Sequence, residues 1–332
     1  MSKTIYILSH GNTLRKCGKR LILQSKEKKI FEIPCHEVAR ILIYGRTEVT
    51  SQTISGILQH NIPIYYLKKS GSLKGKILPQ LDSRVHWRYL QYRQLCNAKY
   101  SIPLAKKCIN AKLHNMQKMI AHITRRGRGT AKLCEPLKRA QKSLQKCKRQ
   151  EEIMGVEGIA TKHYFQVYGQ SLPPEFAFAT RSRRPAQDNA NALLNLGYMT
   201  LFREITAVIE AHGLDPYLGF LHSLQDGRAS LALDILEEFR QPFIDLFIYK
   251  IITTKQITDE HFTNENADIQ INSNGFGKFF KLYEENMGSD DGESPGIRKM
   301  IDSQVVQLKK FLEEKTTYTP FKISKTLAMS AQ

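Results

Sequence analysis

Hydrophobic positions change their spacing near residue 82 of the chain. Before that point, short runs rich in isoleucine and leucine alternate with glycine, proline or charged residues, which is typical of strands and turns. After it, apolar positions recur about every 3.6 residues, the spacing of helices that bury one face. The pattern therefore predicts an α+β protein, with a small β domain over residues 1–82 and a larger helical domain over residues 83–332.

The N-terminal domain is expected to contain several strands and one helix. The predicted elements are strands over residues 3–11, 20–26, 29–34 and 39–45, a helix over 49–61 and a hairpin over 62–79. Thr50 or Ser51 would cap the helix, and Ser70, Gly71 and Ser72 would form the hairpin turn. This domain is too short to carry much catalytic machinery, so we interpret it as a surface for self-association and partner contact.

Three basic helices are predicted next, over residues 83–100, 102–126 and 130–150. We expect a break at Ser101, Ile102 and Pro103 between the first two, and a second break around residues 126–129. Several apolar and aromatic side chains on these helices are interpreted as packing residues, with base stacking as the open alternative for the aromatic ones. They are Trp87, Tyr89, Tyr92, Leu95 and Met116.

The charge of these helices indicates a polyanionic partner. Residues 1–150 hold 32 Lys or Arg and 6 Asp or Glu, a net charge of +26, while the other 18 basic and 25 acidic residues leave the rest of the chain at −7. Between His86 and Gln150, Glu135 is the only acid among 17 basic residues. Such one-sided charge favours nucleic acid. The residues expected to contact DNA are Arg84, Arg125, Arg126, Arg128, Arg181, Arg183 and Arg184.

Glu157 lies between small residues at the predicted start of a helix that follows the basic segment. A carboxylate there has two interpretations: it could favour the positive end of the helix dipole, or it could belong to a metal site. The next loop carries Arg181, Arg183 and Arg184, and a long helix after it is expected to stop at Gly213. Arginines beside a carboxylate–histidine site would suit phosphate binding.

Residues 221–245 combine a histidine, a predicted helix and several carboxylates. Ser230 is expected to cap the helix, and Pro242 is expected to kink or end it. The helical apolar positions are Leu231, Leu233, Leu236, Phe239 and Phe243. This spacing predicts a helix with one face in the core.

Asp234 and Glu237 stand three residues apart on one face of this helix, and Glu238 follows Asp234 by four. Carboxylates on an otherwise apolar helix are costly to bury unless a cation neutralises them, and His222 could supply a nitrogen ligand of that cation. The alternative is that Glu237, Glu238 and Arg240 form a solvated helix face and that His222 is a surface loop residue.

Length and composition agree with an intracellular protein. The 332 residues contain no run of eighteen apolar residues, and the N-terminal apolar stretch is too short for a signal peptide, so we expect a soluble protein without a membrane segment. The six cysteines lack the spacing of a zinc site and are expected to be free thiols of a reducing compartment. A flexible segment is expected near residues 288–296.

Four motifs in order carry a family resemblance: GVEG at 155–158, RRPAQDNANALLNLGY at 183–198, GLDPYLGFLH at 213–222 and SLALDILEEFRQPFID at 230–245. They resemble the CRISPR-associated endonuclease and integrase of the adaptation module, CRISPR-associated protein one. The resemblance implies an N-terminal β-sandwich-like domain followed by a larger all-α catalytic domain. It also implies a cytoplasmic homodimer, two copies of which clamp a dimer of a small partner, CRISPR-associated protein two.

The resemblance further implies a catalytic metal site. Its ligands would be Glu157, His222 and Glu237, with Asp234 as a supporting residue. Two carboxylates and one imidazole suit Mn²⁺ or Mg²⁺. Such a site would act on double-stranded DNA, joining spacer precursors to CRISPR repeats by 3′-hydroxyl attack, or cutting DNA with water. The alternatives are a catalytically inactive DNA-binding scaffold of the same fold and a metal-dependent RNA-processing nuclease.

Overall fold

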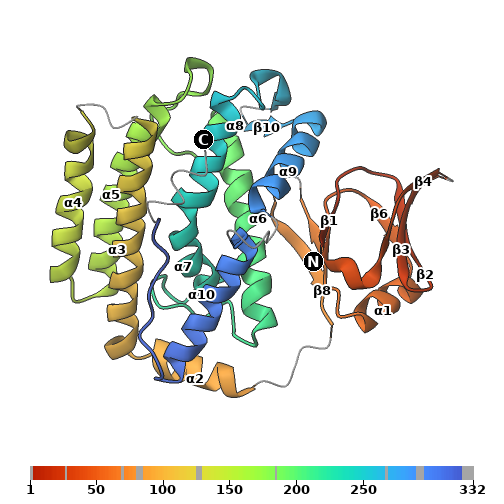
Figure 1. Cartoon of the computed structure of the whole chain (residues 1–332), viewed down its shortest axis with the longest axis horizontal. Helices are drawn as coiled ribbons and strands as arrows, with labels where there is room; N and C mark the ends of the chain where they lie inside the picture. The colour runs from red at the N-terminus through yellow and green to blue at the C-terminus, as the bar shows by residue number, and fades with distance from the viewer. Residues whose placement is uncertain are drawn as a thin grey trace. The chain divides into compact units, whose positions relative to one another are not determined.

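The computed structural model describes residues 3–26, 28–68, 71–79, 85–124, 129–183, 185–265, 268–288 and 295–323. The chain divides into two units, residues 1–83 and 84–332. Each unit is described by itself below (Figure 1). Strands occupy the first unit and mostly helices the second, so the predicted α+β class is confirmed.

Two four-stranded sheets build the first unit. One has the order β1 (Lys3–Ile7), β5 (Val38–Ile43), β7 (Ile64–Leu67) and β8 (Leu73–Ile77), and the other has the order β4 (Lys28–Pro34), β3 (Arg20–Ser25), β2 (Asn12–Cys17) and β6 (Thr47–Val49). The helix α1 (Ser51–Gln59) begins as predicted, because the side chain of Thr50 accepts the N–H of Thr53. The predicted pair β7–β8 is antiparallel, although Ser70 of its turn lies outside the described residues.

Both sheets contribute to one apolar core. Ile41 and Ile64 come from one sheet, Leu14 and Leu21 come from the other, and Ile57 comes from α1, and all five are fully buried. Alternating inward-facing residues from two sheets are the way that a β-sandwich buries its apolar surface. The first unit therefore has the sandwich-like packing that the family resemblance implied.

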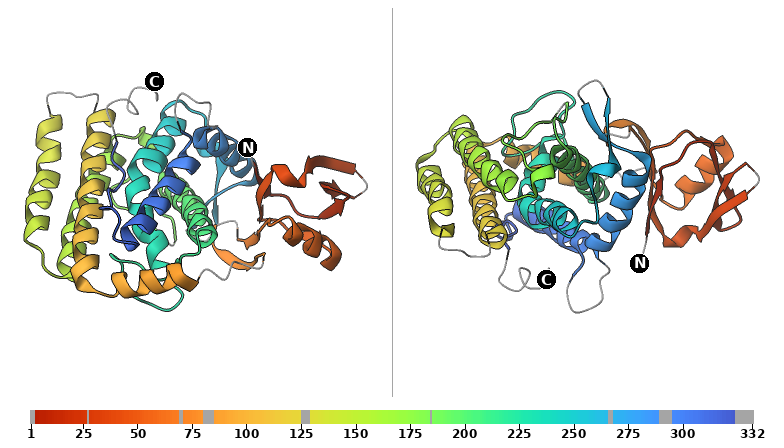
Figure 2. Two further views of the ribbon diagram at one scale, coloured as in Figure 1. Left: turned by 60° about the horizontal axis from the view of Figure 1, so that its bottom comes forward. Right: turned by 90° about the horizontal axis from the view of Figure 1, so that it is seen from above.

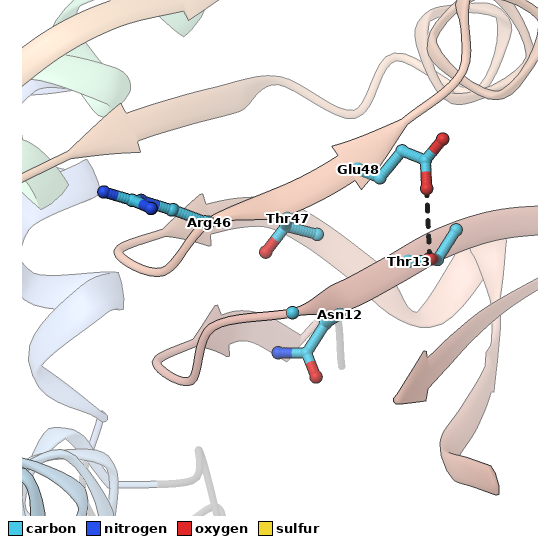
Figure 3. A pocket seen from close by; sticks show the side chains of 6 residues that line it. Asn12, Thr13, Arg46, Thr47 and Glu48 are labelled. Carbon is cyan, nitrogen blue, oxygen red and sulfur yellow. Dashed lines mark hydrogen bonds between the residues drawn. The ribbon is translucent and has the colours of Figure 1, made fainter. Parts of the chain in front are cut away.

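The hydrophobic pattern did not predict two of these strands, β2 and β6. The β2 segment NTLRKC contains only one fully buried aliphatic residue, Leu14, so it lacks an apolar alternation of useful length. Beside these strands lies a surface pocket lined by Gly11, Asn12, Thr13, Arg46, Thr47 and Glu48 (Figure 3). Thr13 donates a hydrogen bond to Glu48 at 3.4 Å there. None of the predicted metal ligands lines this pocket.

The second unit consists mostly of helices. They are α2 (Val85–Leu95), α3 (Ala98–Ile123), α4 (Thr130–Lys146), α5 (Gln150–Gln170), α6 (Asn189–Ala211), α7 (Ser230–Phe239), α8 (Leu246–Thr253), α9 (Ser273–Met287) and α10 (Ile297–Leu312). A two-stranded antiparallel sheet, β9 (Phe262–Glu265) with β10 (Asp268–Ile271), also belongs to this unit. The prediction of an all-α domain did not include this small sheet.

The helix α7 packs against α3 on one side and α6 on the other, while α3, α4 and α5 contact one another (Figures 1 and 2). The helix α6 is long and apolar enough to cross a membrane, yet 67% of its most apolar 18-residue segment is buried inside the protein. The low polarity of α6 therefore reflects its place in the core of this unit. This arrangement puts α7 in the interior, with helices on both sides.

The predicted break between the first two basic helices is wrong. The helix α2 ends at Leu95, and Asn97 caps α3 by accepting the N–H of Lys99 at 2.9 Å. The helix then continues through Pro103, because Leu104 and the residues after it pack into the core and outweigh the one backbone hydrogen bond that proline cannot make. The helix α3 ends at Ile123 and α4 begins at Thr130, and residues 126–128 of the predicted break between them lie outside the described residues.

The packing interpretation holds for some of the residues on these helices. Leu95 and Met116 are buried, whereas Tyr89 and Tyr92 are 60% and 48% exposed. The packing prediction is therefore wrong for the two tyrosines, and base stacking by them stays a prediction. The expected flexible segment near 288–296 lies mostly outside the described residues.

Candidate functional site

The interior helix α7 carries three buried carboxylates. Asp234 and Glu238 are fully buried, and Glu237 is 4% exposed. The neighbouring Arg240 is also largely covered, with its side chain 15% exposed. The alternative interpretation of these residues as a solvated helix face is therefore wrong, and each carboxylate needs partners inside the protein.

The ends of α7 differ in part from the expectation. Its N-terminal cap is Ala229, so the prediction of a Ser230 cap is wrong; the Ser230 hydroxyl instead donates to the carbonyl of Ser223 at 3.1 Å. At the other end α7 stops at Phe239, and Arg240–Asp245 form a π-helical turn that leads into α8. Pro242 lies in this wider turn, which accommodates a residue without an N–H better than a regular α-turn.

Glu157 lies in the third turn of α5 and not at its start, so the interpretation as a helix-dipole residue is wrong. The first turn contains Glu151 and Glu152 instead. The Glu157 side chain is 16% exposed and accepts a hydrogen bond from Thr161 at 2.7 Å. It also accepts one from the ammonium of Lys112 on α3. Glu157 is thus directed at a cation of a neighbouring helix.

Lys112 joins the carboxylates of α5 and α7. Its side chain is 3% exposed, and its Nζ forms an ion pair with Glu157 Oε1 and lies 2.5 Å from Glu237 Oε2. The other oxygen of Glu237 lies 3.1 Å from Nη2 of Arg240. Two of the three predicted metal ligands therefore surround one positive charge, although they stand 80 residues apart in the sequence.

Electrostatics keeps these groups charged. Burial alone would raise the pKa of Glu237, but the charges of Arg240 and Lys112 lower it to about 2. Burial likewise favours neutral Lys112, yet the charges of Glu157 and Glu237 raise its pKa above the ordinary value. The pKa of Glu157 is lowered as well, because the Lys112 charge outweighs the effect of burial. The cluster is a set of mutually dependent buried ions.

His222 is attached to α7 through Asp234. Oδ1 of Asp234 lies 2.6 Å from Nδ1 of His222 and accepts the His222 backbone N–H at 3.0 Å. Oδ2 accepts the backbone N–H groups of Phe220 and Leu221 at 2.6 and 2.9 Å. A carboxylate that holds one ring nitrogen of a histidine fixes the orientation of the other. Asp234 thus contacts His222 in the way expected of a supporting residue.

The donor chemistry of this site fits a cation only in part. Oε2 of Glu237 is buried, and within the described part of the chain it accepts no well-directed hydrogen bond despite its proximity to Lys112. Glu157 and Glu237 already enclose one cation, the Lys112 ammonium. However, no three His, Cys, Asp or Glu side chains among the described residues are grouped closely enough to hold a metal together.

The remaining carboxylates near α7 have neutral hydrogen-bond donors. Glu238 accepts the Tyr318 hydroxyl at 2.6 Å and the Phe321 N–H at 2.7 Å, and burial raises its pKa to about 8. Asp245 accepts the hydroxyls of Tyr164 and Tyr198. The ring of Tyr198 in turn lies 4.7 Å from the guanidinium of Arg240. These contacts hold the π-helical turn and its arginine in place.

Sequence reasoning did not single out Lys112. It lies 45 residues before Glu157 and was one of many lysines in a basic segment. The signal available was its place within a buried stripe of α3, where Cys108 and Met116 are fully buried one turn before and after it. A lysine at an apolar position of an amphipathic helix needs a buried partner.

The arginines predicted to bind DNA are only partly described. Arg84, Arg125, Arg126, Arg128 and Arg184 lie outside the described residues. Arg183 is exposed. Arg181 points inward, because its guanidinium donates to Asn191 at 2.5 Å and Asn195 at 2.8 Å and lies over the ring of Tyr198. These contacts hold the loop before α6.

Comparison with known proteins identifies a family. The family model described as CRISPR associated protein Cas1 matches residues 5–285. One curated relative, CRISPR-associated endonuclease Cas1 3 of Thermus thermophilus, is 29% identical over 327 residues, which cover 96% of this chain and 94% of the relative. The match therefore spans both units of the chain.

Solved structures share the fold. A casposase bound to an integration product superposes with a TM-score of 0.83 at 24% identity, covering 97% of this chain and 93% of the other. A chain of a Cas6-RT-Cas1–Cas2 complex gives a TM-score of 0.85 at 20% identity, covering 98% of this chain and 36% of the larger one. At these identities the two comparisons show a common fold.

The buried Asp245 leads to a prediction of pH-dependent stability. Burial raises its pKa in the folded protein from 3.8 to about 6, so its favourable contribution is present below pH 3.8 and is lost as the pH rises through 6. Relative to Asp245→Asn, the wild-type protein should lose about 3 kcal/mol of unfolding free energy between about pH 4 and pH 7. Urea unfolding at a series of pH values measures this difference, and parallel curves for the two proteins would contradict it.

Proposed function

Because the chain belongs to the Cas1 family of CRISPR-associated proteins, we propose that it is a metal-dependent DNA integrase and endonuclease. It inserts short foreign DNA into a CRISPR array through 3′-hydroxyl attack on the phosphodiesters of the repeat. The relative from Thermus thermophilus is named an endonuclease, which supports the nuclease activity. The casposase that shares the fold was solved with an integration product, which supports strand joining.

One observation carries the proposal: Glu157 of α5 and Glu237 of α7 both contact a single buried cation. Carboxylates from different helices seldom converge in a core unless a cation belongs between them. His222, held by Asp234 at the N-terminal side of α7, is the third residue of the expected set. We propose Glu157, His222 and Glu237 as the ligands of Mn²⁺ or Mg²⁺.

The chain's own residues would prepare the site for phosphoryl transfer. When bound, the metal supplies Lewis acidity that polarises the phosphate and favours an attacking oxygen. Asp234 orients the imidazole of His222, and Arg240 holds one oxygen of Glu237 in place. In-line attack by a DNA 3′-hydroxyl or by water then needs positioning and charge stabilisation, so no serine, cysteine or tyrosine nucleophile is required.

The helix α4 offers a surface for the DNA phosphates. Its exposed basic side chains, together with those of the turn that follows, are Lys132, Lys138, Arg139, Lys142, Lys146, Lys148 and Arg149. The single acid of this helix, Glu135, forms an ion pair with Arg139. Exposed lysines and arginines along one helix track the backbone of a duplex without reading its sequence.

The partners that we propose follow from the family. One structural neighbour is part of a complex with Cas2, and we propose that this protein likewise assembles with a small Cas2-like partner in the cytoplasm. Insertion of both spacer ends requires two attacks, one on each repeat strand. A symmetric homodimer, with the first unit as the two-fold contact, would present equivalent sites for them.

Removal of a proposed ligand should abolish strand joining. Glu157→Ala, His222→Ala and Glu237→Ala are each expected to lower the joining of a short duplex to a repeat-bearing plasmid, with Mn²⁺ and the partner present, by about 100-fold or more. Glu157→Gln and Glu237→Gln keep the side-chain volume and should be equally inactive. Glu151→Ala changes an exposed glutamate of α5 and is the matched control. Near-normal joining by any ligand variant would remove that residue from the site.

Charge reversal on α4 should weaken DNA binding in a salt-dependent way. Lys138→Glu with Lys142→Glu is expected to reduce affinity for any duplex sequence, and the slope of log K against log [salt] should fall by about one for each phosphate that the helix no longer neutralises. Lys278→Glu with Lys281→Glu makes the same change in net charge on exposed positions of α9. Filter binding or fluorescence anisotropy at several salt concentrations compares the α4 and α9 double variants. Equal losses of DNA affinity in the two would mean that α4 does not face the DNA.

The isolated protein should be a homodimer. A chain of 38.1 kDa would then give a mass of about 76 kDa in multi-angle light scattering, because the proposed two-fold contact does not need the partner. Addition of the small partner should produce a larger complex. A mass near that of one chain at every concentration would leave the two-ended mechanism without its geometric basis.

A further inference from the structure

The ammonium of Lys112 occupies the position between the two carboxylates that the proposed function gives to a metal. Lys112 extends from α3, and its Nζ contacts Oε1 of Glu157 on α5 and approaches Oε2 of Glu237 on α7 to 2.5 Å. All three helices contribute to one small volume in the interior. Lys112 is therefore the cation that these two carboxylates share.

Charge balance limits what this volume can hold. Lys112 and Arg240 together match the two negative charges of Glu157 and Glu237, so the cluster is neutral. A divalent cation bound to the same oxygens would lie within about 5 Å of the ammonium, and this repulsion is strong in a buried site. The site can therefore hold the ammonium or the divalent cation between these oxygens, but not both.

The positions of the three proposed ligands agree with a site that holds either the ammonium or the divalent cation. The carboxylates of Glu157 and Glu237 turn toward Lys112, and among the described residues no three acidic, histidine or cysteine side chains close around a metal. His222 is tied through Nδ1 to Asp234, so its other nitrogen has a fixed direction. Glu157 and Glu237 thus enclose the Lys112 ammonium at the position proposed for the metal. His222, the third proposed ligand, takes no part in this contact.

We propose that Lys112 is a placeholder for the divalent cation: it holds Glu157 and Glu237 together in the metal-free protein and leaves their oxygens when the metal binds. The inference rests on the proposed function, because it takes Glu157 and Glu237 to be metal ligands. A lysine suits this role. Its ammonium is a point charge on a flexible four-carbon chain, so it can withdraw while α3 stays in place.

Nuclear magnetic resonance of the lysine ammonium groups tests the placeholder directly. In the full chain labelled with ¹⁵N-lysine, a buried ion-paired ammonium exchanges its protons slowly enough to give an Nζ correlation, which is assigned by its disappearance in Lys112→Arg. Addition of diamagnetic Mg²⁺, followed in parallel by calorimetry, should remove or strongly shift this signal in step with one bound equivalent. A signal that stays unchanged while one equivalent of Mg²⁺ binds would overturn the inference.

A second variant provides an independent readout. Lys112→Met leaves the two buried carboxylates without their shared cation, so the metal-free protein should melt about 10 °C lower. Mn²⁺ should restore most of this stability and should bind this variant about tenfold more tightly than wild type, because no ammonium competes. Lys99→Met removes an exposed charge from the same helix and should change neither quantity. A Lys112→Met protein that Mn²⁺ does not stabilise would contradict the placeholder.

The outcomes separate the inference from the proposed function. If neither Mg²⁺ nor Mn²⁺ binds wild type in a way that Glu157→Gln and Glu237→Gln abolish, then the proposed ligand set is wrong, and Lys112 is a permanent structural ion. If the metal binds with that dependence while the Lys112 signal persists, only the placeholder inference fails. If the metal binds and the signal disappears with it, both stand.

Discussion

Burial of carboxylates on the interior helix α7 is the constraint on which the second unit depends. Packing between α3 and α6 removes water from Asp234, Glu237 and Glu238, and each of them then needs its own compensation. Asp234 uses three backbone N–H groups and His222, Glu237 uses Lys112 and Arg240, and Glu238 uses a tyrosine hydroxyl and one N–H. The helices α3 and α5, the loop before α7 and the residues near 320 are all fixed by these demands.

The groups that neutralise or hydrogen-bond these carboxylates differ in chemistry. As a result, neighbouring carboxylates on α7 differ in charge. Cations keep Glu237 ionised, with its pKa near 2, whereas deep burial raises the pKa of Glu238 to about 8, because the hydrogen bonds from Tyr318 and Phe321 offset the effect of burial only in part. The adjacent glutamates thus present an anion to Lys112 and Arg240 and an uncharged hydrogen-bonding group to Tyr318 and Phe321.

The sequence pointed to four residues of the cluster around α7 but not to the cations that neutralise them. The motifs pointed to Glu157, His222, Asp234 and Glu237 because these residue types recur at a recognisable spacing, and the structure places them around α7. Lys112 could not be found in the same way, since a lysine in a basic segment shows its burial only after three helices have packed. Local rules failed where tertiary packing overrides them, as at Pro103, and where a strand has few apolar residues, as in β2.

The bond between Glu238 and residues 318–321 has a consequence for synthesis of the chain. The ribosome produces α7 some 80 residues before the tyrosine that satisfies its buried glutamate. Until Tyr318 and Phe321 emerge, Glu238 has neither of these donors, and α7 lacks the stacked ring of Phe321 over Phe239. The packing of the nascent second unit around α7 therefore cannot be completed before residues 318–321 have been synthesised.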